Sequence, residues 1–221
     1  MPRDPGTETA WADRRRAQAA AFDQIGERYD EAFPHKEGQV RAVSWLTDQL
    51  KPGARILDAG CGTGVPTAWQ LTEAGMNVIG IDISPVMLSL ARKNVPGATF
   101  TEMDITDLDP GIGEIDAVVA FFSLLMLPHR EIPSALARFR QILVPRGWLV
   151  LGMVEADVDD MPIPFLGAQV RVAGYARSAL RDVVTAAGFV VLQENSVSYD
   201  PASAGLPPET QVTLCCQRDS T

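Results

Sequence analysis

Residues 55–64 read Arg55-Ile56-Leu57-Asp58-Ala59-Gly60-Cys61-Gly62-Thr63-Gly64, a short apolar run that leads into three glycines at alternate positions. The apolar run is typical of a buried strand, and the glycines predict a tight turn after it. Because glycine lacks a Cβ, such a turn can take positive φ and let a ligand press against bare backbone. The helix that follows would offer free N–H groups at its start. The stretch therefore predicts a ligand site at a strand-to-helix turn.

Two carboxylates narrow the choice of ligand. Asp82 ends the next apolar run, where a carboxylate can accept hydrogen bonds from both ribose hydroxyls, so we expect an adenosine compound. Asp58 stands just ahead of the first glycine, where a cationic amino group could pair with it. Dinucleotide binders read G-x-G-x-x-G, and Val65 stands where the third glycine of that pattern would be. A nicotinamide-dependent oxidoreductase is therefore disfavoured.

These residues resemble the first motif of the class I S-adenosylmethionine-dependent methyltransferases. The resemblance continues in order through three more stretches and covers about residues 20–217: Gly80-Ile81-Asp82-Ile83-Ser84-Pro85-Val86-Met87-Leu88, Met103-Asp104-Ile105 and Leu143-Val144-Pro145-Arg146-Gly147. It implies S-adenosylmethionine as cofactor and S-adenosylhomocysteine as product. The candidate cofactor-binding residues are Tyr29, Asp58, Gly60, Cys61, Gly62, Gly64, Asp82, Ile83, Met87, Asp104, Ile105 and Phe121.

Within that set, the resemblance implies that Asp104 accepts the adenine amino group and that Ile83 and Met87 pack on the two faces of the ring. Plain helix core is the alternative for Met87. Cys61 is interpreted as a small residue that fills the turn rather than as a nucleophile.

Apolar runs and helical patterns alternate along the chain. Residues 54–58, 77–82, 98–102, 115–121 and 147–154 read as strands with helices between them, which predicts a parallel sheet covered on both faces. Residues 189–194 and 211–216 then read as a hairpin. The resemblance implies a Rossmann-like, seven-stranded α/β sheet whose last strand inserts antiparallel. We expect one methyltransferase domain over residues 1–221.

The N-terminal segment predicts a cover over the site. Phe22, Ile25, Tyr29 and Phe33 follow helical spacing, and in resembling enzymes such a segment closes over the methionine end of the cofactor. We interpret residues 1–50 as a helical lid and Tyr29 as a residue that touches cofactor or acceptor, and a candidate catalytic group. An amphipathic helix that merely covers a sheet edge is the alternative.

The acceptor side is assigned from fewer signals. His129 follows the fourth strand and could act as a general base, although resembling enzymes carry a histidine at the position of Met126, and a surface histidine is the alternative. Residues 155–174 are interpreted as a substrate cap, with Glu155 as a possible second base. The candidate substrate-binding residues are Phe122, Met126, Glu155, Phe165 and Arg171, of which Arg171 could recognise a carboxylate; core packing and a solvated arginine are the alternatives.

Composition limits the partners. The chain has a formal net charge of -9, which disfavours nucleic acid as acceptor. The longest apolar run, residues 117–128, is too short to span a bilayer, and the N-terminus lacks a signal-peptide core, so we expect no membrane association and a cytoplasmic location. The three cysteines have no metal-site or disulfide spacing, so no metal is expected. A monomer and a homodimer both stay open.

The sequence therefore predicts a methyltransferase that acts on a small, largely apolar metabolite, for example a natural product of secondary metabolism. Oxygen is the favoured acceptor atom because of His129, while nitrogen, sulfur and carbon stay open. A protein of the same fold that binds the cofactor without transferring methyl is the alternative of a different class.

Overall fold

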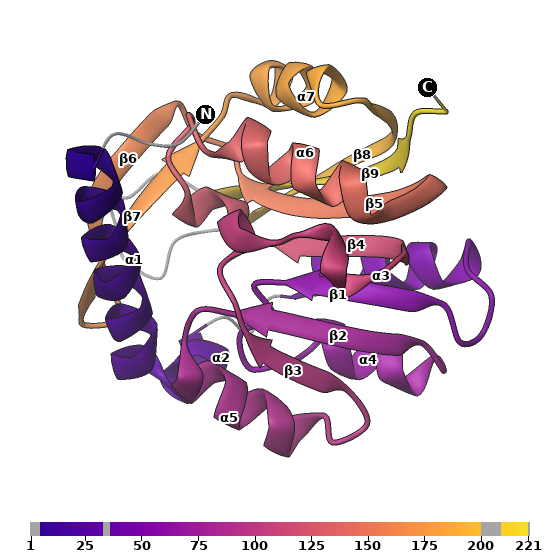
Figure 1. The fold of residues 1–221 in the computed structure, drawn as a ribbon, viewed down its shortest axis with the longest axis horizontal. Coiled ribbons are helices and arrows are strands. Elements are labelled where there is room, and N and C mark those ends of the chain that lie inside the picture. Colours follow the sequence, from indigo (N-terminus) through magenta and orange to yellow (C-terminus); the bar gives the residue numbers. More distant parts are fainter. Residues whose placement is uncertain (1–4, 33–35, 200–208, 221) are drawn as a thin grey trace.

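The computed structural model describes residues 5–32, 36–199 and 209–220 (Figure 1). Seven strands form the main sheet in the order β3-β2-β1-β4-β5-β9-β8. Their bounds are β1 Arg55–Ala59, β2 Asn77–Asp82, β3 Thr99–Glu102, β4 Ile115–Phe121, β5 Leu143–Val154, β8 Phe189–Tyr199 and β9 Glu209–Arg218. The first five pair in parallel, whereas β9 is antiparallel to both β5 and β8. The predicted seven-stranded fold with an antiparallel last strand is confirmed.

Helices cover both faces of this sheet and bury one apolar cluster on each. One cluster takes residues from α3 (Glu37–Asp48), α4 (Thr67–Glu73) and α5 (Pro85–Asn94), and the other from α6 (Ile132–Ile142) and α7 (Arg177–Ala186). The strands β1 and β4 are buried on both sides for this reason, as their continuous apolar runs predict, whereas the edge strand β3 is mostly exposed. Short 3₁₀ turns connect the remaining elements: η1 (Ile105–Asp107), η2 (Pro110–Ile112) and η3 (Leu124–Met126).

Local signals in the sequence set two of these boundaries. Ser84 caps α5, since its hydroxyl oxygen accepts a 3.1 Å hydrogen bond from the Met87 N–H, and Pro85 follows as the first helical residue. β5 begins at Leu143, earlier than the predicted residue 147, so the Pro145-Arg146 turn belongs to the strand. Arg146 has φ 61° there, a left-handed conformation that favours glycine, which the resembling enzymes carry at this position.

The N-terminal segment is two helices rather than one. α1 (Pro5–Ile25) ends at a turn in which Gly26 has φ 51°, and α2 (Arg28–Ala32) follows. Phe33, the last residue of the predicted helical pattern, lies outside the described residues. Figure 1 shows α1 at the side of the molecule, beside the strands β6 and β7.

Residues 158–174 form a second, two-stranded antiparallel sheet, which the sequence did not predict as strands. β6 (Val158–Phe165) pairs with β7 (Ala168–Gly174). The two prolines of β6, Pro162 and Pro164, argue against a strand in the interior of a sheet, but both strands here are edges, where a missing N–H costs little. The hairpin follows β5 along the chain, and its strand β7 contacts α1.

Candidate cofactor and acceptor site

A cavity of about 390 Å³ lies at the carboxyl ends of the parallel strands, where the strand order reverses between β1 and β4. The main sheet, α1 and the β6–β7 hairpin all contribute to its wall. Of the predicted site residues, those that line it are Tyr29, Asp58, Gly60, Cys61, Gly62, Asp82, Ile83, Met87, Asp104, Ile105, Phe121, Phe122, Met126 and Phe165. The structure therefore brings most of the predicted cofactor residues together around one space.

The glycine turn after β1 is shaped for close approach. Gly60 has φ 80°, and a Cβ built on it would lie 2.3 Å from the Ser123 Cβ, so no other residue fits without displacing the loop after β4. Gly62 has φ 52° and has no atom within 4 Å of its Cβ position, which leaves its backbone open to a ligand. Gly64 does not line the cavity; its Cβ position lies 3.1 Å from Val95 Cγ2, so it packs the turn against the end of α5.

Asp58 is a buried carboxylate without a neutralising partner. Its residue is 2% exposed, and its Oδ2 makes no hydrogen bond with any residue that the structure describes. Burial, and next the charge of Asp82, raise the pKa of Asp58 to about 8. Because the side chain lines the cavity, a ligand with a cationic amino group would relieve this cost, which fits the predicted role.

Asp82 organises the turn and keeps acceptor capacity. Its Oδ2 accepts a 2.9 Å hydrogen bond from the Gly62 N–H, and its Oδ1 accepts one of 2.9 Å from the Ser84 N–H. Burial raises its pKa, although the bonds from Ser84 and Gly62 oppose the rise. Each carboxylate oxygen can accept a second hydrogen bond, so ribose hydroxyls fit here without displacing the backbone contacts.

Asp104 has an unexpected partner on α1. Its Oδ1 accepts 2.6 Å hydrogen bonds from the Thr106 N–H and hydroxyl, and its Oδ2 lies 2.7 Å from the Arg15 Nε. Arg15 also donates to Asp107 at 2.5 Å. The carboxylate that the resemblance assigns to the adenine amino group is therefore already paired with an arginine of α1.

Another part of the cavity lining is apolar and aromatic. Phe22, Tyr29 and Phe165 form a three-ring cluster with centroids 6.3 to 6.5 Å apart. Burial, followed by the charges of Asp30, Asp82 and Glu209, raises the pKa of Tyr29 to about 12, so its hydroxyl stays neutral. The cluster joins α1, α2 and the hairpin, so these three elements meet at this part of the cavity.

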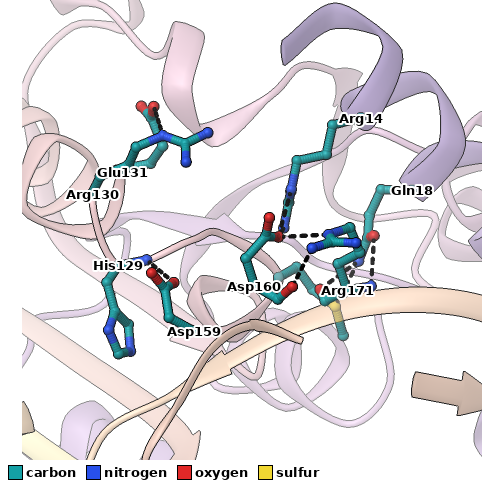
Figure 2. A network of polar contacts seen from close by, with 9 residues as sticks. Arg14, Gln18, His129, Arg130, Glu131, Asp159, Asp160 and Arg171 are labelled. Atoms are coloured by element: carbon teal, nitrogen blue, oxygen red, sulfur yellow. Dashed lines mark hydrogen bonds and ion pairs between the residues drawn. The ribbon is translucent and has the colours of Figure 1, made fainter. Parts of the chain in front are cut away.

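Three predicted acceptor residues do not line the cavity. The His129 Nε2 lies 2.9 Å from the Gly174 carbonyl oxygen, and its ring stacks on Tyr175 with centroids 4.0 Å apart, so it is held against the hairpin. Figure 2 shows the His129 backbone N–H directed at Asp159. Glu155 pairs with Arg177 at 2.6 Å, and the hydrogen bond from Arg177 lowers its pKa, which makes it a poorer base. Arg171 pairs with Asp160, and both residues line a second cavity instead.

The cavity also includes residues that sequence reasoning missed. Four residues of α1 line it, namely Trp11, Arg14, Arg15 and Gln18. Gln18 is 4% exposed, and its amide nitrogen lies 2.9 Å from the Met126 Sδ, a weak acceptor. No motif or regular apolar stripe marks these positions, and Arg14, Arg15 and Gln18 have polar partners that are distant in sequence.

Comparison with known proteins agrees with this geometry. Residues 56–147 match a family model described as a methyltransferase domain. An uncharacterized methyltransferase of Oceanobacillus iheyensis is 31% identical over 137 residues, which cover 59% of this chain and 64% of the relative. The chain thus matches less than two thirds of the length of that curated relative.

Solved structures extend the likeness to the whole fold. The 1,6-didemethyltoxoflavin N1-methyltransferase of Burkholderia thailandensis, with S-adenosylhomocysteine bound, has a TM-score of 0.68 at 22% identity, covering 99% of this chain and 92% of that one. The [4+2]-cyclase SpnF has a TM-score of 0.64 at 22% identity, covering 82% of this chain and 81% of that one. Residues 56–147 thus match a methyltransferase domain, and the chain has the fold of a solved methyltransferase, which confirms the resemblance that the motifs predicted.

The raised pKa of Asp58 gives a prediction about stability. An acid whose pKa is higher in the folded state loses stability as pH rises from its unfolded value, near 4, to its folded value, about 8. We expect Asp58→Asn to be more stable than the wild type at pH 8 by about a few kcal/mol, and the difference to shrink toward pH 5. Calorimetric unfolding of the ligand-free protein between pH 5 and 9 measures this. Asp182→Asn, a change at an exposed residue of α7, is the control. If the stability of Asp58→Asn depended on pH in the same way as that of the wild type, the raised pKa of Asp58 would be contradicted.

The position of Asp82 predicts a loss of nucleoside affinity. We expect Asp82→Ala to weaken S-adenosylhomocysteine binding by about 1 to 3 kcal/mol, because the ribose loses a charged acceptor. Isothermal titration measures the Kd, and a melting curve checks that the Gly62 turn survives. An unchanged Kd in a folded variant would remove the ribose assignment.

Proposed function

We propose that this chain transfers the methyl group of S-adenosylmethionine to a small, largely apolar metabolite. The observation that carries the proposal is one cavity whose lining combines a buried, unneutralised carboxylate beside a glycine turn with an aromatic chamber formed by Phe22, Tyr29 and Phe165. The residues present fit the cofactor. Asp58 would pair with its amino group, Gly60 and Gly62 would let it approach the backbone closely, and Asp82 would accept hydrogen bonds from its ribose. When bound, its sulfonium supplies an electrophilic methyl group.

The chain's own contribution is then mainly positioning. Methyl transfer is an in-line displacement, so holding a nucleophile against the methyl carbon supplies several orders of magnitude in rate. The ring cluster of Phe22, Tyr29 and Phe165 would hold the acceptor and exclude water. In this proposal, residues 1–50 act as the lid and residues 155–174 as the cap of one methyltransferase domain.

The acceptor atom is constrained by what the cavity lacks. Among the described lining residues there is no histidine, and His129 is engaged with Gly174 and Tyr175. The support for oxygen as the favoured atom, which rested on His129, is therefore withdrawn. O-methylation remains open for an oxygen that is already ionised near neutral pH, and amine nitrogen, thiolate sulfur or an activated carbon equally need no protein base.

The remaining expectations belong to the same proposal. No helix in the described ranges is long and apolar enough to cross a membrane, and no group of three His, Cys, Asp or Glu side chains there could hold a metal ion. We propose a cytoplasmic enzyme of secondary metabolism, a monomer or homodimer, that takes a small-molecule acceptor and no nucleic acid.

Methyl transfer itself is tested by a product screen. We expect wild-type protein, incubated with S-adenosylmethionine and a panel of apolar metabolites, to form S-adenosylhomocysteine together with a methylated product detected by mass spectrometry. Asp82→Ala in the same screen is the control. Cofactor binding without any methylated product across the panel would favour a protein of the same fold that does not transfer methyl. One solved structure with this fold is named as a [4+2]-cyclase rather than as a methyltransferase.

The placement of His129 predicts a small kinetic effect. We expect His129→Ala to keep the pH dependence of kcat and to lower kcat by less than about tenfold, because the ring holds the hairpin and does not reach the cavity. A general base contributes about 100-fold or more. Steady-state rates from pH 6 to 9 with saturating acceptor distinguish the two, and a 100-fold loss with an altered pH profile would restore the general-base hypothesis.

A further inference from the structure

A second cavity, of about 300 Å³, lies between α1 and the β6–β7 hairpin. Arg14 on α1, Arg171 on β7 and Arg130 before α6 all line it, together with a single carboxylate, Asp160. Figure 2 shows Arg14 and Arg171 converging on Asp160, while Arg130 lies beside Glu131. Three guanidinium groups around one space are notable in a chain whose net charge is -9.

Asp160 is shared by two of these arginines. Its Oδ1 accepts hydrogen bonds from the Arg14 Nε at 3.0 Å, the Arg14 Nη2 at 2.9 Å and the Arg171 Nε at 2.9 Å. The Arg171 Nη2 donates to its backbone oxygen. Within the described ranges, the Nη1 group of neither arginine makes a hydrogen bond, so this cluster keeps one positive charge and free donors.

The electrostatic setting favours an anion. Burial alone would raise the pKa of Asp160, but the hydrogen bonds from Arg171 and Arg14 lower it overall, so the carboxylate stays ionised. The Arg14 side chain is only 10% exposed, so its charge is largely removed from water and only half compensated. A planar guanidinium pair with free N–H groups suits a carboxylate or a phosphate.

The backbone holds this arrangement in place. Asp160 has φ 50°, and the register of the hairpin shifts between Val158 and Met161, so Asp160 sits at a bulge that re-aims its side chain toward α1. Such a strained position persists only where the surrounding contacts fix it.

The two cavities share a wall. Trp11, Arg14 and Gln18 line both of them, so a molecule that reaches these residues from the first cavity lies next to the arginine cluster. We propose that the second cavity binds an anionic group of the acceptor, a carboxylate or a phosphate, while its apolar body occupies the aromatic chamber. This inference rests on the proposed function and names its substrate class: an apolar body that carries an anionic substituent.

The test compares a charged and a neutral probe. We expect 1-naphthoate to bind the wild-type protein, with S-adenosylhomocysteine present, at least about tenfold more tightly than 1-naphthamide in isothermal titration. Arg171→Gln should abolish the difference, and Arg16→Gln, an exposed arginine of α1 paired with Asp13, should preserve it. Equal affinity for the two probes in the wild type, or a preference that survives Arg171→Gln, would overturn the proposal. S-adenosylhomocysteine affinity, titrated separately, reports on the proposed function, and the probes are also compared without it.

Two further arms separate an anion site from a structural clamp and from a site for free anions. We expect Asp160→Asn, which removes a competing negative charge, to strengthen naphthoate binding severalfold, whereas a clamp with no anion role would show no gain in a variant that stays folded by its melting curve. If Asp160→Asn does not fold, the Arg171→Gln result decides alone. Inorganic phosphate should bind much more weakly than naphthoate; comparable affinity would assign the cavity to a free anion and overturn the acceptor assignment.

Discussion

The contact between Gly60 and Ser123 is the constraint on which the site depends. These residues follow β1 and β4, the two strands at which the strand order reverses, and the Ser123 hydroxyl donates a 2.6 Å hydrogen bond to the Ala59 carbonyl. Because Gly60 has no side chain, the two loops touch, and the turn after β1 is fixed from both sides. Asp58 and Phe121, at the ends of these strands, are thereby held in the wall of one cavity.

The helix α1 is attached to this frame by ion pairs as well as by apolar burial. Arg15 joins α1 to Asp104 and Asp107 at the nucleoside end, and Arg14 joins it to Asp160 on the hairpin. Exposed ion pairs contribute little each, but pairs that are mostly withdrawn from water hold geometry strongly once made. α1 therefore contacts both Asp104 and the hairpin, and a ligand that competes for Asp104 also acts on this helix.

The sequence predicted the parts of the site whose signals are local. The glycine turn, Asp58, Asp82 and the Ser84 cap each follow from neighbouring residues, because a strand, a turn and a helix start are written within a few positions. The arginines of α1 carry no such signal, since Arg14 and Asp160 are separated by 146 positions and meet only through tertiary packing. For His129, the sequence predicted its position after β4 but not the direction of its ring. That direction depends on Gly174 and Tyr175, which no local pattern links to His129.

The distribution of charge around the cavity matters more for binding than the net charge of the chain. Asp58 and Asp82 are both buried at the ends of β1 and β2, and burial raises the pKa of each, so this part of the cavity favours a cation. Across α1, two arginines share one carboxylate, so the hairpin end favours an anion. Between them the wall is aromatic and apolar, where no charge is stabilised. A ligand pair that is cationic at one end and anionic at the other therefore matches this protein, although its overall charge of -9 would repel the anion at long range. Whether the anion binds is decided by its short-range interaction with the guanidinium groups inside the cavity, where water screens them less.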